Sequence, residues 1–309
     1  MPPHHLIDPV GTLLPAPHRD LTFGTFLFPK SSEGPALLSQ ARVAEELGYD
    51  LIGVPDHPNW GHYLDQWSLM SAIIGHTSRI EVFSAVSSLA LRQPPAVLAK
   101  AALTLDALAP GRFHLGLGVG AEPGIASIGG PQWTPGESVD RIREAIELTR
   151  VFWSGQSTGN YRGAYYQLTE ASLPPAPSPG LDIWIGAIKP RLRRLTAHAA
   201  DGWLPGMLSI DPDVIKPEVD HLDAEIRAAG RPPGSVRRIY NTIAEKLQPE
   251  SDGLLIGPAD QWIDQLTHVA LEFGFDTFVF GDRQTTVEHL HRFAEEVIPG
   301  VRADVAAAR

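Results

Sequence analysis

The feature that most constrains the fold of this chain is an alternation of short apolar runs with longer stretches of helical periodicity, from residue 21 to residue 298. We count eight runs of each kind, at about 35 residues per pair, which is the usual size of a βα unit. Such alternation is typical of a parallel sheet with crossover helices. The count predicts a closed (β/α)8 TIM barrel, and an open doubly wound sheet of six or seven strands is the alternative.

These units divide the chain into a flexible N-terminal arm (1–20), a single barrel domain (21–300) and a C-terminal tail (301–309). A small β-hairpin around Arg162 and Gly163 follows the fourth βα unit as an insertion. The predicted strands cover 21–28, 49–55, 80–89, 112–120, 181–187, 202–206, 236–247 and 275–281. The predicted helices cover 37–48, 65–78, 94–111, 137–153, 190–200, 211–229, 258–273 and 285–298.

Composition excludes several classes of protein. The absence of cysteine from the 309 residues rules out disulfides, thiolate nucleophiles, Fe–S clusters and cysteine-ligated zinc. A formal net charge of −11 disfavours binding to nucleic acid or to an anionic membrane surface. No apolar run approaches the ~20 residues of a membrane span, and the N-terminus lacks the basic and apolar regions of a signal peptide. We therefore expect a cytoplasmic protein that acts on a small molecule.

Candidate catalytic residues follow the second predicted strand. In a βα barrel, the loops after the carboxyl ends of the strands form the active site. The second strand is followed by Asp56 and His57, and then by Trp60. A histidine at this place can take or give a proton near neutral pH, while the adjacent acid and indole would flank a planar ligand. The alternative is a loop histidine that caps a neighbouring element.

The fourth predicted strand ends in a glycine run at 116–120, with Glu122 close behind. Bare backbone lets a ligand ring approach closely, and Glu122 stands where a pocket acid would lie. The run also matches the dinucleotide fingerprint G-x-G-x-x-A, which requires a helix to open at its end. Prolines and glycines follow instead, so we interpret the segment as a long loop and reject a Rossmann site.

Four positive charges follow the fifth predicted strand, at positions 189, 191, 193 and 194. They stand at a helix N-terminus, where the helix dipole favours anions. An anionic ligand would resolve this conflict, and a solvated basic face is the alternative. Arg283, after the eighth strand, is a second candidate phosphate contact.

Other chemistries find less support in the sequence. His289 and His291 are two positions apart on a predicted helix and face different directions, so we do not expect a metal site. The chain has no G-x-S-x-G elbow for a serine hydrolase. Carboxylates near strand ends, at Asp56, Glu122 and Glu245, leave a cofactor-free hydrolase open as an alternative.

Five segments occur in an order that resembles one known family. They are AEELGYDLIGVPDH (44–57), the run from AVSSLALRQPP to GLGVGAE (85–122), ESVDRIREAIELTRVFW and its continuation to YYQL (137–168), DIWIGAIKPRLRRLTAHAADGW (182–203) and IGPADQWIDQLTHVALEFGFDTFVFG (256–281). The chain resembles the bacterial luciferase-like monooxygenase superfamily, whose members are (β/α)8 barrels that use reduced flavin or the deazaflavin coenzyme F420. The resemblance covers nearly all of the chain after residue 20.

This resemblance implies a set of site residues. His57 would be the proton donor or acceptor, with Asp56 beside the cofactor ring and Glu122 as a further catalytic acid. Glu122 is offset by about one residue from the acid of the sugar-phosphate dehydrogenase branch. In F420 members the third strand often bulges under the ring through a non-proline cis peptide, which here corresponds to Ala85–Val86. The implied cofactor-binding positions are Asp56, Ala85, Val86, Ser87, Gly118, Gly120, Gly186, Ala187, Lys189 and Arg191.

The resemblance also implies a reaction. The V-P-D-H ending of the second strand favours F420 over FMN, and hence hydride transfer between the deazaflavin and a small organic substrate. The alternative is an FMNH2-dependent monooxygenase that uses O2, and a relative that binds the coenzyme without turnover is a third reading. We expect Phe28, Trp60 and Tyr63 to contact the substrate. A homodimer is expected, together with a flavin or F420 reductase that supplies reduced cofactor.

Overall fold

A computed structural model describes residues 19–120, 124–206, 212–242 and 246–309. Its central element is a closed parallel barrel. The first barrel strand pairs with both the second and the last, and the third pairs with the fourth, which is labelled β5. The predicted (β/α)8 barrel is therefore confirmed, and the open sheet is excluded. In order around the barrel, the strands are β1 (Thr22–Phe26), β2 (Leu51–Val54), β3 (Glu81–Ser84), β5 (Phe113–Gly118), β8 (Ile183–Gly186), β9 (Gly202–Leu204), β10 (Arg237–Thr242) and β13 (Thr277–Phe280).

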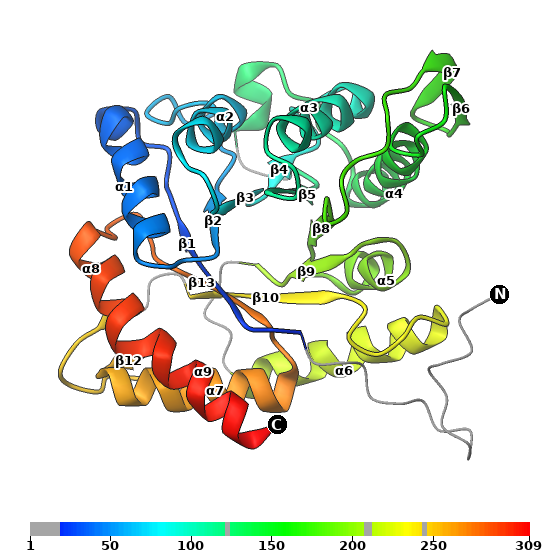
Figure 1. The fold of residues 1–309 in the computed structure, drawn as a ribbon. Coiled ribbons are helices and arrows are strands. Elements are labelled where there is room, and N and C mark those ends of the chain that lie inside the picture. Colours follow the sequence, from blue (N-terminus) through cyan, green and yellow to red (C-terminus); the bar gives the residue numbers. More distant parts are fainter. Residues whose placement is uncertain (1–18, 121–123, 207–211, 243–245) are drawn as a thin grey trace.

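The helices lie around the outside of the strands (Figure 1). They are α1 (Gly34–Glu46), α2 (Gln66–His76), α3 (Pro95–Leu108), α4 (Pro135–Phe152), α5 (Pro190–Ala199), α6 (Pro212–Ala228), α7 (Ala259–Phe273), α8 (Val287–Arg292) and α9 (Ile298–Ala308), with short 3-10 helices at Ser31–Glu33 and Ile125–Ile128. Among the described residues, none of these helices has the length and apolarity that a membrane crossing requires.

The structure departs from the sequence prediction at three elements. The third predicted strand is divided, because β3 stops at Ser84 and a separate two-residue strand, β4 (Ser87–Ser88), follows a turn. The observed strand β10 is shorter than the predicted seventh strand (236–247). It ends together with its neighbour β13, at the pair Thr242 and Phe280. Beyond it, β11 (Lys246–Leu247) pairs outside the barrel with β12 (Ile256–Gly257).

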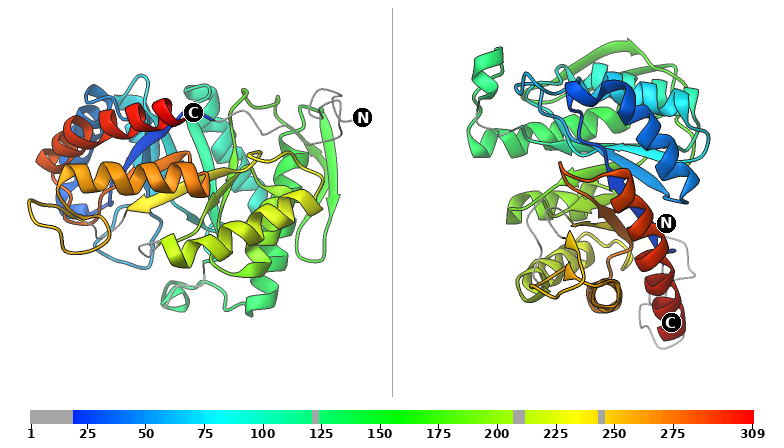
Figure 2. Two further views of the ribbon diagram at one scale, coloured as in Figure 1. Left: turned by 90° about the horizontal axis from the view of Figure 1, so that it is seen from below. Right: turned by 90° about the vertical axis from the view of Figure 1, so that its left-hand side faces the viewer.

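The third departure is at the C-terminus. The predicted helix 285–298 is a succession of α8, a π-helical turn (Phe293–Val297) and α9. The domain boundary expected at residue 300 falls inside α9, whose Val301 and Val305 are buried. Figure 2 shows the red α9 lying along the orange α7, so the last residues are part of the helical layer.

The barrel interior is filled by aromatic side chains that face glycines. A Cβ atom added to Gly202 would lie 2.4 Å from the Trp184 ring, and one added to Gly53 would lie 2.6 Å from Phe83. Trp184 and Phe83 are fully buried, at 0% exposure. Close packing of this kind leaves no continuous channel along the axis.

Charged and polar groups close the barrel at the amino ends of its strands. The His114 Nε2 and Glu81 Oε2 atoms are 2.8 Å apart, and the His114 ring stacks on Trp184 with centroids 4.4 Å apart. Arg237 donates to the hydroxyls of Thr22 and Thr277, at 3.2 and 3.1 Å. Because this end is closed, a ligand must enter at the carboxyl ends of the strands.

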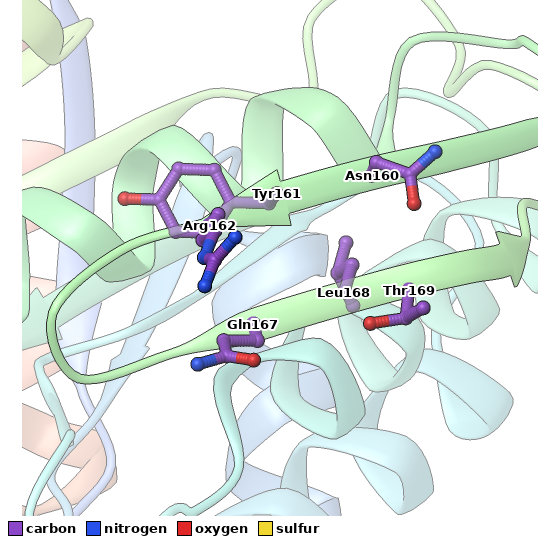
Figure 3. Close-up of a pocket in the computed structure, with 6 residues that line it drawn as sticks. All are labelled: Asn160, Tyr161, Arg162, Gln167, Leu168 and Thr169. Atoms are coloured by element: carbon purple, nitrogen blue, oxygen red, sulfur yellow. The ribbon is translucent and has the colours of Figure 1, made fainter.

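The predicted hairpin insertion is confirmed. Strands β6 (Thr158–Arg162) and β7 (Gln167–Ser172) are antiparallel and project beyond α4 (Figure 1). Buried Glu144 of α4 accepts hydrogen bonds from the backbone N–H groups of residues 164, 165 and 166 at the hairpin turn. Figure 3 shows a shallow pocket formed by the two hairpin strands themselves. It lies apart from the strand ends that form the site described next.

Candidate active site at the carboxyl ends of the barrel strands

The loop between β2 and α2 carries the candidate proton-transfer residue His57 within an aromatic cluster. The imidazole of His57 stacks on the indole of Trp60, with ring centroids 4.1 Å apart and planes inclined by 8°. Tyr63 meets both rings edge-on, at 5.9 Å from His57 and 5.1 Å from Trp60. These ring contacts restrict the plane of the imidazole.

Tyr63 connects this cluster to the barrel interior. It packs against the interior cluster that contains Phe28, which is 5% exposed. Its hydroxyl is buried and has no hydrogen-bond partner among the described residues. Burial raises the pKa of Tyr63, while the nearby charges of Arg283 and Lys30 act in the opposite direction. Tyr63 thus joins Trp60 to the cluster that contains Phe28, and the substrate contacts expected of these three residues stay predictions.

Asp56 is buried, and both of its carboxylate oxygens are engaged by the protein. Oδ1 lies 2.6 Å from a terminal nitrogen of Arg92, and Oδ2 accepts from Arg92 Nε at 3.1 Å. Oδ2 also accepts the backbone N–H of Ser88 at 2.9 Å. We expected Asp56 beside the cofactor ring as an acid; the geometry instead makes it an anchor between β2, β4 and Arg92.

The turn between β3 and β4 contains the expected cis peptide bond, Ala85–Val86. The Val86 side chain occupies the space beside two glycines. A Cβ atom on Gly118 would lie 2.5 Å from Val86 Cγ2, and one on Gly186 would lie 3.2 Å from it. In this structure the bare backbone of Gly118 therefore makes room for Val86, where we had expected it to admit a ligand ring.

Hydrogen bonds from two directions hold the residues that follow this turn. Ser87 donates to Gln66 Oε1 at 2.7 Å and accepts from Trp67 Nε1 at 3.0 Å. The Ser88 hydroxyl is buried and has no hydrogen-bond partner among the described residues. Gly120 lies against it, since a Cβ atom there would be 2.1 Å from Ser88 Oγ. The predicted acid Glu122 lies outside the described residues.

The turn between β8 and α5 provides the candidate phosphate site. Ala187 is fully buried; its N–H donates to the Leu204 carbonyl at 2.9 Å, and its carbonyl accepts from Trp203 Nε1 at 2.9 Å. Gly186 is half-buried, and Lys189 is exposed immediately before the first turn of α5.

Most of the basic cluster is paired with acids of neighbouring helices. Arg191 lies 3.3 Å from Asp140 of α4, Arg193 lies 3.0 Å from Glu218 of α6, and Arg194 lies 3.6 Å from Glu225 of α6. These ion pairs agree with the alternative of a basic face for the three arginines, and the cofactor contacts expected of Lys189 and Arg191 stay predictions. Among the residues that the structure describes, Lys189 makes no ion pair.

Three buried polar atoms near the strand ends test whether this region suits a polar cofactor. Ser88 Oγ, Tyr63 Oη and Asn241 Oδ1 each lack a hydrogen-bond partner within the described part of the chain. Buried polar groups are normally paired, so such atoms fit a site that receives polar groups of a ligand. No cluster of potential metal ligands occurs among the described residues.

Sequence reasoning missed Arg92, Gln66 and Asn241. Arg92 follows the third strand, where an inspection of every charged residue after a strand would have found it. Gln66 and Asn241 are ordinary amides with no distinguishing pattern around them. Their importance depends on partners in other βα units, which sequence spacing does not reveal.

The fold is that of a (β/α)8 barrel enzyme, and its candidate ligand site lies at the carboxyl ends of the strands. The family model for luciferase-like monooxygenases matches residues 21–244, and the chain belongs to that family. An F420-dependent glucose-6-phosphate dehydrogenase 2 of Rhodococcus jostii is 35% identical over 175 residues, 54% of this chain and 52% of that protein. The matched region thus spans about half the length of that relative.

Longer matches cover most of the chain at lower identity. An F420-dependent glucose-6-phosphate dehydrogenase of Beutenbergia cavernae is 27% identical over 317 residues, covering 86% of this chain and 93% of the relative. An F420-dependent secondary alcohol dehydrogenase structure, in complex with an F420–acetone adduct, gives a TM-score of 0.79 at 19% identity and covers 92% of this chain and 99% of that one. A long-chain alkane monooxygenase structure gives a TM-score of 0.74 at 14% identity, with 92% of each chain covered. The two structural likenesses bear on the fold.

Proposed function

We propose that this protein is an F420-dependent oxidoreductase that transfers a hydride to or from a small organic substrate, with His57 as the proton donor or acceptor. Two relatives support the cofactor, since both are F420-dependent glucose-6-phosphate dehydrogenases and one of them matches most of the chain. Bound F420 would carry the hydride. The chain's own residues would bind the cofactor, orient the substrate and exchange the proton.

The observation that carries this proposal is a short connection between His57 and Val86. Asp56, the neighbour of His57, accepts the N–H of Ser88, two residues after Val86. The candidate proton-transfer group and the turn expected beneath the cofactor ring are therefore fixed to one another at the same end of the barrel. A ring that rests near Val86 would therefore lie at the same end of the barrel as the β2–α2 loop.

The remaining residues have separate roles in this proposal. Lys189 and the backbone of Gly186 would contact the phosphate at the start of α5, where the helix dipole favours an anion. Arg191 would contribute less, because it already pairs with Asp140. Trp60 would fix the imidazole plane, and Phe28 and Tyr63 would line the substrate side.

A titration of the protein with F420 and with FMN, followed by fluorescence and absorbance, tests the cofactor. Binding of F420 without FMN supports the proposal. Binding of FMN with substrate-dependent O2 consumption would establish the monooxygenase alternative. Turnover without either cofactor would favour a hydrolase, for which Asp56 is poorly suited because its carboxylate is engaged by Arg92; Glu122 and Glu245 lie outside the described residues.

Two partner relationships complete the proposal. A second enzyme, such as an F420 reductase, would supply the reduced cofactor when the hydride runs to the substrate. The protein would act as a homodimer, as the family resemblance implies, and in the cytoplasm, as expected from the sequence. Sedimentation velocity over a range of concentrations tests the dimer, and a single species of 33.5 kDa would contradict it.

A further inference from the structure

Arg92 bridges the two ends of the loop that carries His57. One terminal nitrogen of Arg92 lies 2.6 Å from Asp56 Oδ1 and 2.7 Å from Asp65 Oδ2. Asp56 directly precedes His57, and Asp65 directly precedes α2. A single guanidinium therefore joins the first and last residues of the segment 56–65, which contains His57, Trp60 and Tyr63.

Each end of this bridge is also tied to a fixed element. The Asp56 carboxylate accepts the Ser88 N–H of β4 at 2.9 Å. Asp65 caps α2, since its Oδ1 accepts the N–H and the hydroxyl of Ser68, both at 2.9 Å. The backbone N–H of Arg92 in turn donates to the Ser88 carbonyl at 2.9 Å. These hydrogen bonds thus hold the ends of the loop in a fixed position relative to the turn that carries Val86.

The chemistry of the bridge favours arginine over other residues. A guanidinium presents several N–H donors in a rigid plane, so it can bind one carboxylate through two nitrogens and reach a second one. The side chain of Asp56 is 1% exposed and that of Arg92 is 19% exposed, so loss of the cation would leave a buried carboxylate without its counter-charge. The ammonium of lysine is a point charge that cannot reproduce the two-pronged contact.

We propose that Arg92 is a positioning residue, which sets the place of His57 relative to the cofactor turn by holding Asp56 and Asp65 together. This inference rests on the proposed function, in which His57 moves the proton. Arg92 itself need not touch the substrate or the cofactor, because it acts through the loop that it closes.

The middle of the loop has its own contacts, from Ser31 N–H to the His62 carbonyl and from Leu64 N–H to the Pro29 carbonyl. The loop is therefore expected to remain folded but misplaced when the bridge is lost.

The test uses the full-length variants Arg92→Gln, Arg92→Lys and Asp65→Asn. Arg112→Gln is the control, because Arg112 is another half-buried arginine with several side-chain hydrogen bonds, here to the Ile80 and Thr77 carbonyls, but it lies at the amino end of β5. Hydrogen–deuterium exchange of residues 57–64 reports on the loop without any cofactor, through the Trp60 and Tyr63 N–H groups that donate to His57 and Trp60 carbonyls. F420 titration and steady-state kinetics report on function.

We expect Arg92→Gln to speed exchange of residues 57–64 by about tenfold and to lower kcat by about 100-fold, with F420 affinity within about threefold of wild type. Arg92→Lys and Asp65→Asn should give intermediate losses, and Arg112→Gln should leave the exchange of this segment unchanged. Unchanged exchange and kcat in both Arg92→Lys and Asp65→Asn would overturn the proposal even if Arg92→Gln fails to fold. If the wild-type protein does not bind F420, the proposed function fails, whereas the exchange data still decide whether Arg92 fixes the loop.

Discussion

The imidazole of His57 and the indole of Trp60 lie parallel, with centroids 4.1 Å apart and an angle of 8° between the rings. A stacked pair restricts rotation of the imidazole out of its plane. A proton-transfer group needs such restriction, because its effect depends on the direction of one nitrogen–hydrogen bond. Trp60 is therefore expected to matter for turnover more than for cofactor affinity.

Replacing Trp60 tests this relationship. Trp60→Ala should lower kcat by about tenfold, the size expected for loss of one aromatic contact, and Trp60→Phe should retain most of the activity. F420 affinity, measured by fluorescence, should change little in both variants. Equal losses in the alanine and phenylalanine variants would point to a role of the indole nitrogen rather than of stacking.

His57→Ala should lower kcat by about 10²- to 10⁴-fold, because a positioned acid or base commonly contributes that much. The dissociation constant for F420 should stay within a few fold of wild type. His62, which is exposed on the same loop, provides the matched control through His62→Ala. Unchanged turnover in His57→Ala would remove the proposed proton-transfer role, and an equal loss in His62→Ala would show that the loop rather than the imidazole is responsible.

The glycines around Val86 are predicted to be required for its packing. Gly118→Ala should destabilise the protein by about 1–3 kcal/mol, since the new methyl group would lie 2.5 Å from Val86 Cγ2. The double variant Gly118→Ala with Val86→Ala should recover part of that loss. Chemical denaturation of the four proteins in a double-mutant cycle measures the coupling, and strictly additive effects would contradict the contact.

Glu45 is predicted to make stability depend on acid pH. Partial burial alone would raise the pKa of Glu45, but hydrogen bonds from the N–H groups of Ser78, Arg79 and Ile80 outweigh it and lower the pKa from 4.5 to about 2. A depressed carboxyl pKa stabilises the folded state above the unfolded value, and this contribution is lost as pH falls from 4.5 toward 2.

Unfolding free energies at several pH values measure this effect. Glu45→Gln should cost about 1–3 kcal/mol at pH 7, and the difference from wild type should shrink below pH 4.5 as Glu45 itself becomes protonated. Glu46→Gln, at the exposed neighbouring position, should cost little at any pH. A difference that stays constant down to pH 2 would show that the hydrogen bonds do not depend on the charge of the carboxylate.

The parts of the molecule that could be predicted from sequence are those whose causes are local or repeated. The eight βα units predict the barrel, and the pairing of β1 with β13 in the structure shows that it is closed. The Ala85–Val86 peptide was located through a family resemblance rather than through the physics of these residues.

The features that sequence could not decide depend on partners far away in sequence. The basic residues after β8 left an anion site and a paired basic face open, and the structure places Asp140, Glu218 and Glu225 beside three of them. The carboxylate of Asp56 likewise looked available until Arg92 was found against it, 36 residues further along the chain. Ion pairs between separate βα units produce no characteristic spacing of residues in the sequence. Sequence alone therefore could not have distinguished a ligand site from a surface of ion-paired side chains.

Lys189 is predicted to be the member of the basic cluster that contributes to cofactor binding. It is exposed before the first turn of α5 and makes no ion pair among the described residues, whereas Arg191 is held by Asp140. Lys189→Gln should weaken F420 binding by about fivefold at low ionic strength, and added salt should reduce the difference. Arg191→Gln should have a smaller effect, because its positive charge is already partly neutralised. A deazaflavin without the phosphate-bearing tail should bind the wild type and Lys189→Gln equally, since neither protein would have a phosphate to contact. Equal weakening of both ligands would place Lys189 near the ring instead of the phosphate.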